Sequence, residues 1–475
     1  MNCAMNPYLL PISWTRLHPV IWMGCFLVLV LTPTVNAEPT VKRLGKRQQG
    51  SDWPIFLGPT ADSRSTETGI TAWPASGPRL VWSRPLTESY GIGSVSQGRY
   101  YQFDYANGRA LLDCLESETG EPIWQFSYPS KYTDTYGYNR GPRCSPVIDD
   151  NRVYIYGAEG MLHCLDAVRG TEIWKVDVNR KFGVVQNFFG VGSSPVIHQD
   201  LLIVMVGGSP AEDQTIPPGQ LDRVSGNGTG IVAFEKLTGK VRYQLSDDLA
   251  SYAGPRIVKH GGRDWGFMFL RAGLTLFNPT TGKQDDEFPW RARLLESVNA
   301  STPIIVDDMV FISETYGPGS ALLRFGNGKL EPVWQDNPHQ RQKSMQAHWN
   351  TPVYHDGFLY GSSGRHSYNA ELRCIELKTG KVRWSQPRLT RCSLLYVDEH
   401  LVCLGEDGTL RLLKANPEKY EVVSTVTPTL KSANPVGERP LLKYPAWAAP
   451  ILSHGLMYVR GADYLACYDL IPVEQ

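Results

Sequence analysis

Twelve polar and aromatic residues have side chains suited to ligand binding, and they share one kind of position in the sequence. Each lies shortly before an apolar run that predicts a short strand. Aromatic rings and guanidinium groups stack on planar or sugar-like ligands, and amide groups hydrogen-bond them. Alternatively, these side chains fill a channel and satisfy loop backbone. The set comprises Tyr138, Asn139, Arg143, Gln186, Asn187, Phe188, Asn299, His348, Trp349, Asn350, Arg391 and Trp447.

Catalytic and metal chemistry have less support. No aspartate is among the twelve residues, and the sequence contains no CxxC, HExxH or His/Cys cluster, which disfavours a structural zinc site. The run Asp149–Asp150–Asn151 is interpreted as a hairpin turn rather than a metal site. Cys114, Cys164, Cys374 and Cys467 occupy equivalent positions in different repeats, which predicts buried thiols rather than disulfides. We therefore assign no catalytic and no metal-binding residue from the sequence.

The elements that position the twelve residues recur along the chain. Between Cys144 and Trp174 the sequence reads "CSPVIDDNRVYIYGAEGMLHCLDAVRGTEIW". It predicts one strand, a tight polar turn and a second strand, and then a third strand, a glycine turn and a fourth strand that contains the tryptophan. Similar units end at Trp124, Trp334 and Trp384. The spacings Trp82–Trp124, Trp124–Trp174 and Trp334–Trp384 are 42, 50 and 50 residues. Such periods are typical of propeller blades with four strands each.

The last unit of the chain has only three strands. Its missing fourth strand is supplied by Pro78–Leu86, which contains Trp82 and has no earlier strands of its own. Closing a ring through both termini also protects the edges of its sheets. The sequence therefore predicts an all-β, eight-bladed β-propeller with four antiparallel strands per blade, whose last blade is closed by the N-terminal strand.

The repeat resembles the PQQ (pyrroloquinoline quinone) repeat of the quinoprotein alcohol dehydrogenase-like propellers, in its exported bacterial type. The resemblance is carried by a small residue, an acidic residue, Thr-Gly and Trp, as in Cys114, Glu116, Thr119–Gly120 and Trp124. It implies a propeller, with no guarantee of the cofactor. It also implies that the motif aromatic residue of each blade docks against the adjacent blade. Those residues are Trp82, Trp124, Trp174, Tyr243, Trp334 and Trp384.

Strand order predicts which face of the propeller binds. The turns between first and second strands, and between third and fourth strands, lie on one face and are short in this sequence. The second-to-third loops and the connections between blades lie on the other face, and they are long and varied, as in Gly207–Gly230. Binding function usually resides where loops are elaborated. The twelve residues are predicted to surround the mouth of the central channel on this loop-rich face.

The composition and the N-terminal segment indicate the class of partner, the location and the domain limits. The 475 residues carry 47 basic and 47 acidic side chains, which argues against nucleic acid as the main partner. Residues 1–37 have the layout of a signal peptide, so we expect an exported protein, periplasmic or secreted, without an integral membrane domain after cleavage. Alternatively, this segment is kept as an anchor. Residues 38–51 are predicted to be a disordered leader and 52–77 a lead-in segment. A single propeller domain is expected over 78–475.

Two functions follow from the resemblance and the face. The first is a non-catalytic binding or scaffold module, similar to the outer-membrane assembly scaffold of the Bam type, with a protein, glycan or small ligand on the loop-rich face. The second is a PQQ-dependent alcohol or polyol dehydrogenase, which needs an aspartate base and Ca²⁺ as well as PQQ. No adjacent cysteine pair is present, and Arg143 and Arg391 alone support the quinone site. The sequence favours the binding module, without an assigned cofactor.

Overall fold

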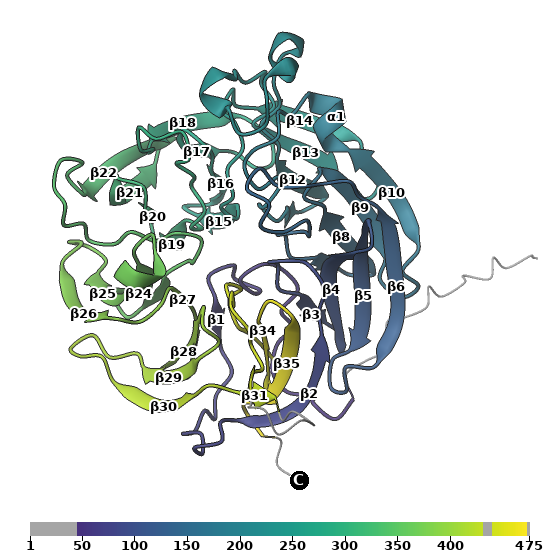
Figure 1. The fold of residues 1–475 in the computed structure, drawn as a ribbon. Coiled ribbons are helices and arrows are strands. Elements are labelled where there is room, and N and C mark those ends of the chain that lie inside the picture. Colours follow the sequence, from purple (N-terminus) through teal and green to yellow (C-terminus); the bar gives the residue numbers. More distant parts are fainter. Residues whose placement is uncertain (1–44, 431–438, 473–475) are drawn as a thin grey trace, which may run out of the picture. The chain divides into compact units, whose positions relative to one another are not determined.

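The computed structural model describes residues 45–430 and 439–472, within the unit that extends from Thr40 to Gln475. The signal peptide and the start of the leader predicted for the chain lie outside these residues. In the described part of this unit, eight sheets of four antiparallel strands are arranged around a centre, as Figure 1 shows. The predicted eight-bladed β-propeller is therefore confirmed.

The first four blades follow one another along the chain, each with its strands in sequence order from the centre outward. Blade 1 contains β3 (Ser94–Ser96), β4 (Arg99–Ala106), β5 (Arg109–Glu116) and β6 (Pro122–Pro129). Blade 2 contains β7 (Val147–Asp149), β8 (Arg152–Tyr156), β9 (Met161–Asp166) and β10 (Glu172–Asp177). Blade 3 contains β11 (Val196–His198), β12 (Leu201–Met205), β13 (Ile231–Glu235) and β14 (Val241–Leu245). Blade 4 contains β15 (Arg256–His260), β16 (Arg263–Phe269), β17 (Gly273–Phe277) and β18 (Gln284–Pro289).

The second half of the ring ends at the blade that both ends of the domain share. Blade 5 contains β19 (Ile304–Val306), β20 (Met309–Glu314), β21 (Gly319–Gly326) and β22 (Lys329–Gln335). Blade 6 contains β23 (Val353–His355), β24 (Phe358–Ser363), β25 (Glu371–Glu376) and β26 (Val382–Pro387). Blade 7 contains β27 (Cys392–Val397), β28 (His400–Gly405), β29 (Leu410–Lys414) and β30 (Val422–Val426). Blade 8 contains β33 (Ile451–Ser453), β34 (Leu456–Arg460), β35 (Tyr464–Asp469) and, as its outer strand, β2 (Arg79–Pro85).

Short elements complete the described chain. A two-residue strand, β1 (Arg64–Ser65), pairs in parallel with β27. A small hairpin outside the blades contains β31 (Thr429–Leu430) and β32 (Arg439–Pro440). The helical segments are α1 (Val178–Phe182), η1 (Ala211–Thr215), η2 (Leu221–Arg223) and η3 (Ser367–Asn369).

Burial explains why the middle strands of the blades are mostly apolar in sequence and the outer strands contain both apolar and polar residues. All residues of the middle strands β12 and β17 are buried, because neighbouring blades cover both faces of these strands. The outermost strand β10 alternates instead between exposed and partly buried side chains. The run Asp149–Asp150–Asn151 forms the β7–β8 turn, with Asp150 at a φ of 50°, so the hairpin interpretation is confirmed.

Each motif aromatic residue contacts the third-to-fourth turn of the next blade. The Trp82 indole Nε1 donates to the Ser117 carbonyl at 3.0 Å. Gly120 in that turn has a φ of 73°, and a Cβ there would lie 2.8 Å from the Trp82 ring, so glycine serves both the turn and the contact. The other five aromatic side chains also donate to a backbone carbonyl of the next blade's turn. The pairs are Trp124 with Ala167, Trp174 with Lys236, Tyr243 with Pro279, Trp334 with Leu377, and Trp384 with Asn416.

The lead-in segment crosses the centre of the ring. Trp53 exchanges two backbone hydrogen bonds of 2.9 Å with Val95 of blade 1. The Pro54 carbonyl then accepts from Ile148 of blade 2, and Ser63 bonds the backbone of blade 7 next to β1. Since these partners belong to the innermost strands β3, β7 and β27, and the Ala61 carbonyl accepts from Arg256 of blade 4, the segment lies inside the ring of innermost strands.

The end of the predicted leader differs from expectation. Residues 45–51 were expected to be disordered, but Arg47 is buried and bonds Asp469 at 2.5 Å and the carbonyls of His454 and Ile471. These partners lie in blade 8 and just after it. A buried arginine is stabilised where a carboxylate and carbonyl oxygens surround it, which a composition-based expectation does not detect.

Candidate functional site

A cavity of about 950 Å³ opens among the loops of the loop-rich face. Its wall includes connections between blades, such as Arg143 and Trp447, and second-to-third loops, such as Tyr316 and Arg365. Phe56 and Leu57 of the lead-in segment line it as well. Because that segment crosses the channel, it forms the floor of the cavity.

Eight of the twelve predicted residues line this cavity. They are Tyr138, Arg143, Phe188, His348, Trp349, Asn350, Arg391 and Trp447. The other four hold loop backbone instead. Asn139 accepts from the Gly141 amide, Gln186 donates to the Thr133 carbonyl, and Asn187 donates to the Ala250 carbonyl. Asn299 is fully buried and donates to the carbonyls of Leu270 and Trp290.

One wall of the cavity is built around a buried ion pair. The Arg391 guanidinium binds Glu406 with Nη2 to Oε2 at 2.7 Å and Nε to Oε1 at 3.2 Å. Its face lies 4.3 Å from the Trp349 ring and 5.5 Å from the Trp447 ring. Burial alone would raise the pKa of Glu406, but hydrogen bonds from Arg391 and from the Trp447 indole hold it below its ordinary value. The Glu406 carboxylate therefore stays ionised. It accepts directly from the Trp447 indole and holds Arg391 against the rings of both tryptophans.

His348 continues this wall and is locked in one tautomer. Its Nδ1 faces Arg391 Nη1 at 3.5 Å, and its Nε2 lies 3.1 Å from the Tyr316 hydroxyl. Since an arginine can only donate, Nδ1 is the acceptor and the proton sits on Nε2. Burial, together with the charges of Arg391 and Arg365, lowers the pKa of His348 to about 3. The imidazole is therefore neutral across the physiological range.

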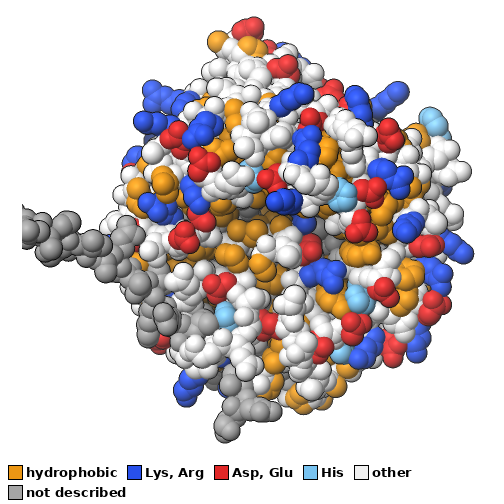
Figure 2. Space-filling view, turned by 180° about the vertical axis from the view of Figure 1, so that it is seen from behind, with side chains coloured by type: hydrophobic (Ala, Val, Ile, Leu, Met, Phe, Trp, Pro, Cys, Tyr) orange, Lys and Arg blue, Asp and Glu red, His pale blue; other side chains and the backbone are white. Residues whose placement is uncertain are grey.

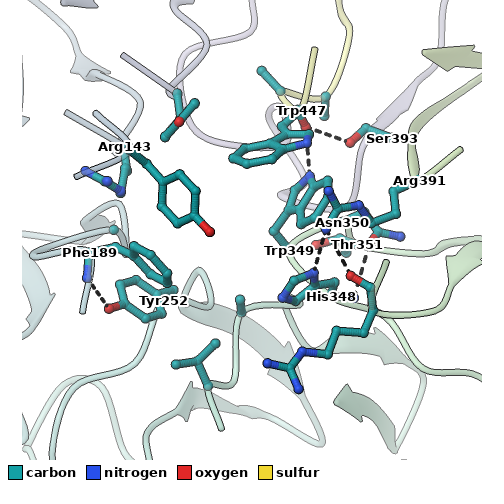
Figure 3. A pocket seen from close by; sticks show the side chains of 18 of the residues that line it. Arg143, Phe189, Tyr252, His348, Trp349, Asn350, Thr351, Arg391, Ser393 and Trp447 are labelled. Atoms are coloured by element: carbon teal, nitrogen blue, oxygen red, sulfur yellow. Dashed lines mark hydrogen bonds between the residues drawn. The ribbon is translucent and has the colours of Figure 1, made fainter. Parts of the chain in front are cut away.

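The opposite wall is organised by Asp134. Its buried carboxylate accepts from Arg143 Nη2 at 3.0 Å and from the backbone amides of Tyr136, Tyr138 and Asn139. Arg143 in turn lies between the rings of Tyr90 and Phe189, at 5.4 and 5.7 Å. Figure 3 shows this group and the Arg391 group on opposite sides of an open space. Both walls therefore use one arginine, paired with one buried carboxylate, to hold aromatic rings.

Several lining residues were missed by the sequence analysis. Tyr90 and Tyr252 lie directly before the innermost strands of blades 1 and 4, so the rule that selected the twelve residues also fits them. Blade 4 is a degenerate copy of the repeat, which hid its position. Tyr316, Arg365 and Tyr368 come from second-to-third loops, which no repeat position marks. For these three the only signal is the face to which their loops belong.

The lining residues do not suit PQQ and its Ca²⁺ ion, although the cavity of about 950 Å³ is large enough for a ligand of this size. Ca²⁺ takes six to eight oxygen ligands, largely carboxylates and amides. Among the lining residues Glu296 is the one carboxylate, and the Asn350 amide is already bonded to the Ser362 carbonyl and the His348 amide. No group of three His, Cys, Asp or Glu side chains suited to a metal occurs in the described residues. The donor set thus lacks what the cofactor needs.

The face shown in Figure 2 carries charges of both signs. Figure 2, which views the side turned away in Figure 1, shows basic and acidic side chains interspersed over that face. Within the described residues no helix is long and apolar enough to span a membrane. All seven cysteines of the described chain are buried free thiols.

The fold and the repeat define a PQQ-type propeller, and the family comparison agrees. A family model described as outer membrane protein assembly factor BamB matches residues 108–386. The chain belongs to this family.

Two curated relatives are both outer membrane protein assembly factors BamB. The chain is 22% identical to that of Shewanella oneidensis over 274 residues, covering 54% of this chain and 60% of the relative. It is also 22% identical to that of Yersinia pestis over 356 residues, covering 72% of this chain and 76% of the relative. The match therefore spans only three fifths of the length of the first relative.

Two solved structures share the fold at low sequence identity. BamB from Moraxella catarrhalis has a TM-score of 0.53 and 14% identity, covering 83% of this chain and 98% of that one. Quinohemoprotein alcohol dehydrogenase from Comamonas testosteroni has a TM-score of 0.59 and 12% identity, covering 90% and 81%. Since BamB and an alcohol dehydrogenase both share the fold of the chain, the fold alone does not separate the two functions.

Proposed function

We propose that this chain is an exported, non-catalytic propeller that binds a protein partner at the cavity on its loop-rich face. The observation that carries the proposal is the state of the polar groups in the cavity walls. Glu406 and Asp134 are engaged by Arg391 and Arg143, and His348 is neutral and bonded at both nitrogens. A catalytic site needs an acid, base or nucleophile poised to change state near neutral pH. Here Glu406, Asp134 and His348 position aromatic rings instead. Glu314, whose pKa burial raises to about 7, accepts from Ser297 and Gly317 and is not a lining residue of the cavity.

The comparisons support the same function. Both curated relatives, and the family model, carry the name of an assembly factor of the outer membrane. By this similarity we propose a protein partner in the bacterial envelope and a periplasmic location, reached through the signal peptide over 1–37. We also propose the domain limits 52–77 for the lead-in segment and 78–475 for the propeller. No cofactor is needed for this role.

Site-specific photo-cross-linking in cells tests the proposal. A photoreactive amino acid replaces Tyr138 or Tyr368 on the cavity rim, and Lys378 in the β25–β26 turn serves as the control on the short-turn face. All three side chains are exposed, so each variant should fold. We expect the same protein adduct from both rim positions and none from Lys378. Adducts confined to Lys378, or no adduct from the rim, would overturn the proposal.

The dehydrogenase alternative has its own test. Purified protein is titrated with PQQ in the presence of Ca²⁺ and then assayed with alcohols and an artificial electron-accepting dye. We expect neither stoichiometric binding of PQQ nor turnover. Asp134 and Glu406 are committed to Arg143 and Arg391, and Glu296, the one carboxylate among the lining residues, cannot serve alone as base and Ca²⁺ ligand set. Stoichiometric binding with turnover would establish the enzyme.

A further inference from the structure

We propose that the cavity is an anchor pocket for a short extended segment of a partner protein, with an aromatic side chain inside the pocket and an acidic residue bound at Arg365. This inference rests on the proposed function and names the chemistry of the partner. It follows from the size of the cavity, the state of its polar groups and its charge.

The size of the cavity suits a chain segment with a large side chain. Its volume of about 950 Å³ is near the upper end of the roughly 300–1,000 Å³ found for pockets that enclose a drug-sized ligand. The floor is apolar, since it includes Phe56 and Leu57, and the walls include Tyr90, Trp349 and Trp447. Aromatic rings of this kind pack against an inserted ring at centroid distances of about 4.5–7 Å.

The polar groups of the walls argue for a peptide rather than a glycan. Sugar hydroxyls need free acceptors and donors beside the stacking rings, chiefly carboxylates and amides. Asn350 is committed to backbone groups, and Glu406 and Asp134 lie behind their arginines. Glu296 is the one carboxylate among the lining residues, fewer than several sugar hydroxyls need. What the cavity presents to a ligand is mainly ring and aliphatic surface, which an apolar side chain matches.

The charge of the cavity identifies what lies next to that side chain. Arg143 and Arg391 are each paired with a buried carboxylate. Arg365 lies 4.4 Å over the Tyr316 ring, and within the described residues no carboxylate is within ion-pair distance of it. Burial raises the pKa of Glu314, the nearby carboxyl that interacts with Arg365, to about 7, so Glu314 is only partly ionised at neutral pH. An acidic residue of the partner would supply the missing charge.

The rim is suited to contact the partner around the anchor. Tyr368 is 85% exposed and Tyr138 is 63% exposed, and Leu294 on the same rim is 43% exposed. Large exposed side chains around a desolvated pocket are typical of protein interfaces, where they exclude water from the buried anchor.

A set of capped tetrapeptides tests the inference on the purified full chain. The probes are acetyl-Gly-Phe-Glu-Gly-amide, its Phe→Ala analogue, its Glu→Lys analogue, and cellopentaose as a glycan. Binding is measured by calorimetry and by the change in intrinsic tryptophan fluorescence, to which Trp349 and Trp447 in the cavity wall contribute. We expect saturable binding of the Phe-Glu peptide, with affinity at least fivefold lower for each analogue and no binding of cellopentaose. Equal affinity for all three peptides, or binding of cellopentaose alone, would overturn the inference.

Two matched pairs of variants assign the contacts. Arg365→Gln should abolish the preference for the Glu peptide over the Lys peptide, whereas Arg341→Gln, at an exposed arginine outside the cavity, should preserve it. Leu294→Asp should weaken binding of the Phe-Glu peptide, whereas Leu237→Asp, at an exposed leucine of the β13–β14 turn, should not. Parallel effects in both members of a pair would contradict the inference. If the rim cross-links to a protein but the peptides show no preference, the anchor fails while the proposed function stands.

Discussion

The outer edge of the ring and its mouth use the same residue types in opposite ways. At the outer edge, Trp82 and five equivalent aromatic residues all donate to the backbone of the next blade's turn. At the mouth, Trp349 donates to the Trp447 carbonyl and the Trp447 indole donates to Glu406, and no other blade repeats this arrangement in the described residues. The aromatic contacts that stabilise the fold are thus repeated from blade to blade, whereas the tryptophan contacts at the proposed binding site occur once in the described residues. Substitutions at the outer edge should therefore lower stability, and substitutions at the mouth should lower binding.

The largest effect is expected at the outer edge. Trp82→Ala removes a buried ring from the blade that closes the ring, and truncation of a buried aromatic residue costs about 3–5 kcal/mol. The free energy of unfolding, measured by urea denaturation, should fall by that amount. Trp82→Phe is the matched control, since it keeps most of the ring and loses chiefly the bond to Ser117, worth about 1 kcal/mol. Equal losses in both variants would contradict the packing account.

The second effect is expected in the wall of the cavity. Glu406→Ala leaves the Arg391 guanidinium buried without its carboxylate, and breaking a buried pair in this way costs about 3 kcal/mol or more. The Trp447 indole also loses its acceptor, so tryptophan fluorescence should change along with stability. A stable variant with unchanged fluorescence would show that the ion pair does not position the rings.

The third prediction concerns pH and the lead-in segment. His454 in blade 8 hydrogen-bonds Asp52 at 3.0 Å and the Gln49 carbonyl. Burial alone would lower the pKa of His454, but these bonds raise it above its ordinary value near 6.5. A raised pKa in the folded state means that the stabilisation is complete below pH 6.5 and is lost as the pH rises through the folded value.

At the acidic end of the range, Asp52 acts in the opposite direction. Burial would raise the pKa of Asp52, but bonds from His454, Gln97 and Ser96 lower it, so its contribution is lost only as the pH falls through that lowered value. Because the pKa of His454 is raised, the melting temperature of the native chain should decline between pH 6 and 8, and that of His454→Gln should decline less. An equal decline in both would show that another group is responsible. Glu67, whose pKa burial raises, is the neighbouring carboxyl that accepts from the His454 amide.

The smallest effect on stability is expected at the rim. Tyr368→Ala changes a largely exposed side chain, so the free energy of unfolding should stay within about 0.5 kcal/mol of the native value. Binding of the cross-linked partner should nevertheless weaken. A large loss of stability with binding intact would mean that the rim supports the fold rather than recognition.

The fold was predictable because its signals repeat. Eight copies of one pattern specify strand order, turn positions and the closing strand that contains Trp82, so errors in single copies do not matter. The degenerate fourth blade was still counted from its strands, although its motif tryptophan is missing.

The site was only partly predictable, because position before a strand does not fix side-chain direction. That rule brought Arg143, Arg391 and both mouth tryptophans to the cavity, but Asn299 follows it and is buried against backbone. Glu406, which pairs with Arg391, lies directly after β28 and opposite Arg391 across the β27–β28 hairpin of blade 7, where its amide also donates to the Arg391 carbonyl. This pairing follows from the register of one hairpin, in which Cys392 pairs with Gly405, and the rule of position before a strand does not include that register.

The most direct test of the account compares one rim variant with the native chain in two assays. The double variant Tyr138→Ala/Tyr368→Ala is measured for its affinity to the purified cross-linked partner and for its free energy of unfolding. The account predicts at least a tenfold loss of affinity with the free energy of unfolding unchanged within about 1 kcal/mol. Unchanged affinity would contradict the claim that the loop-rich mouth is the binding site.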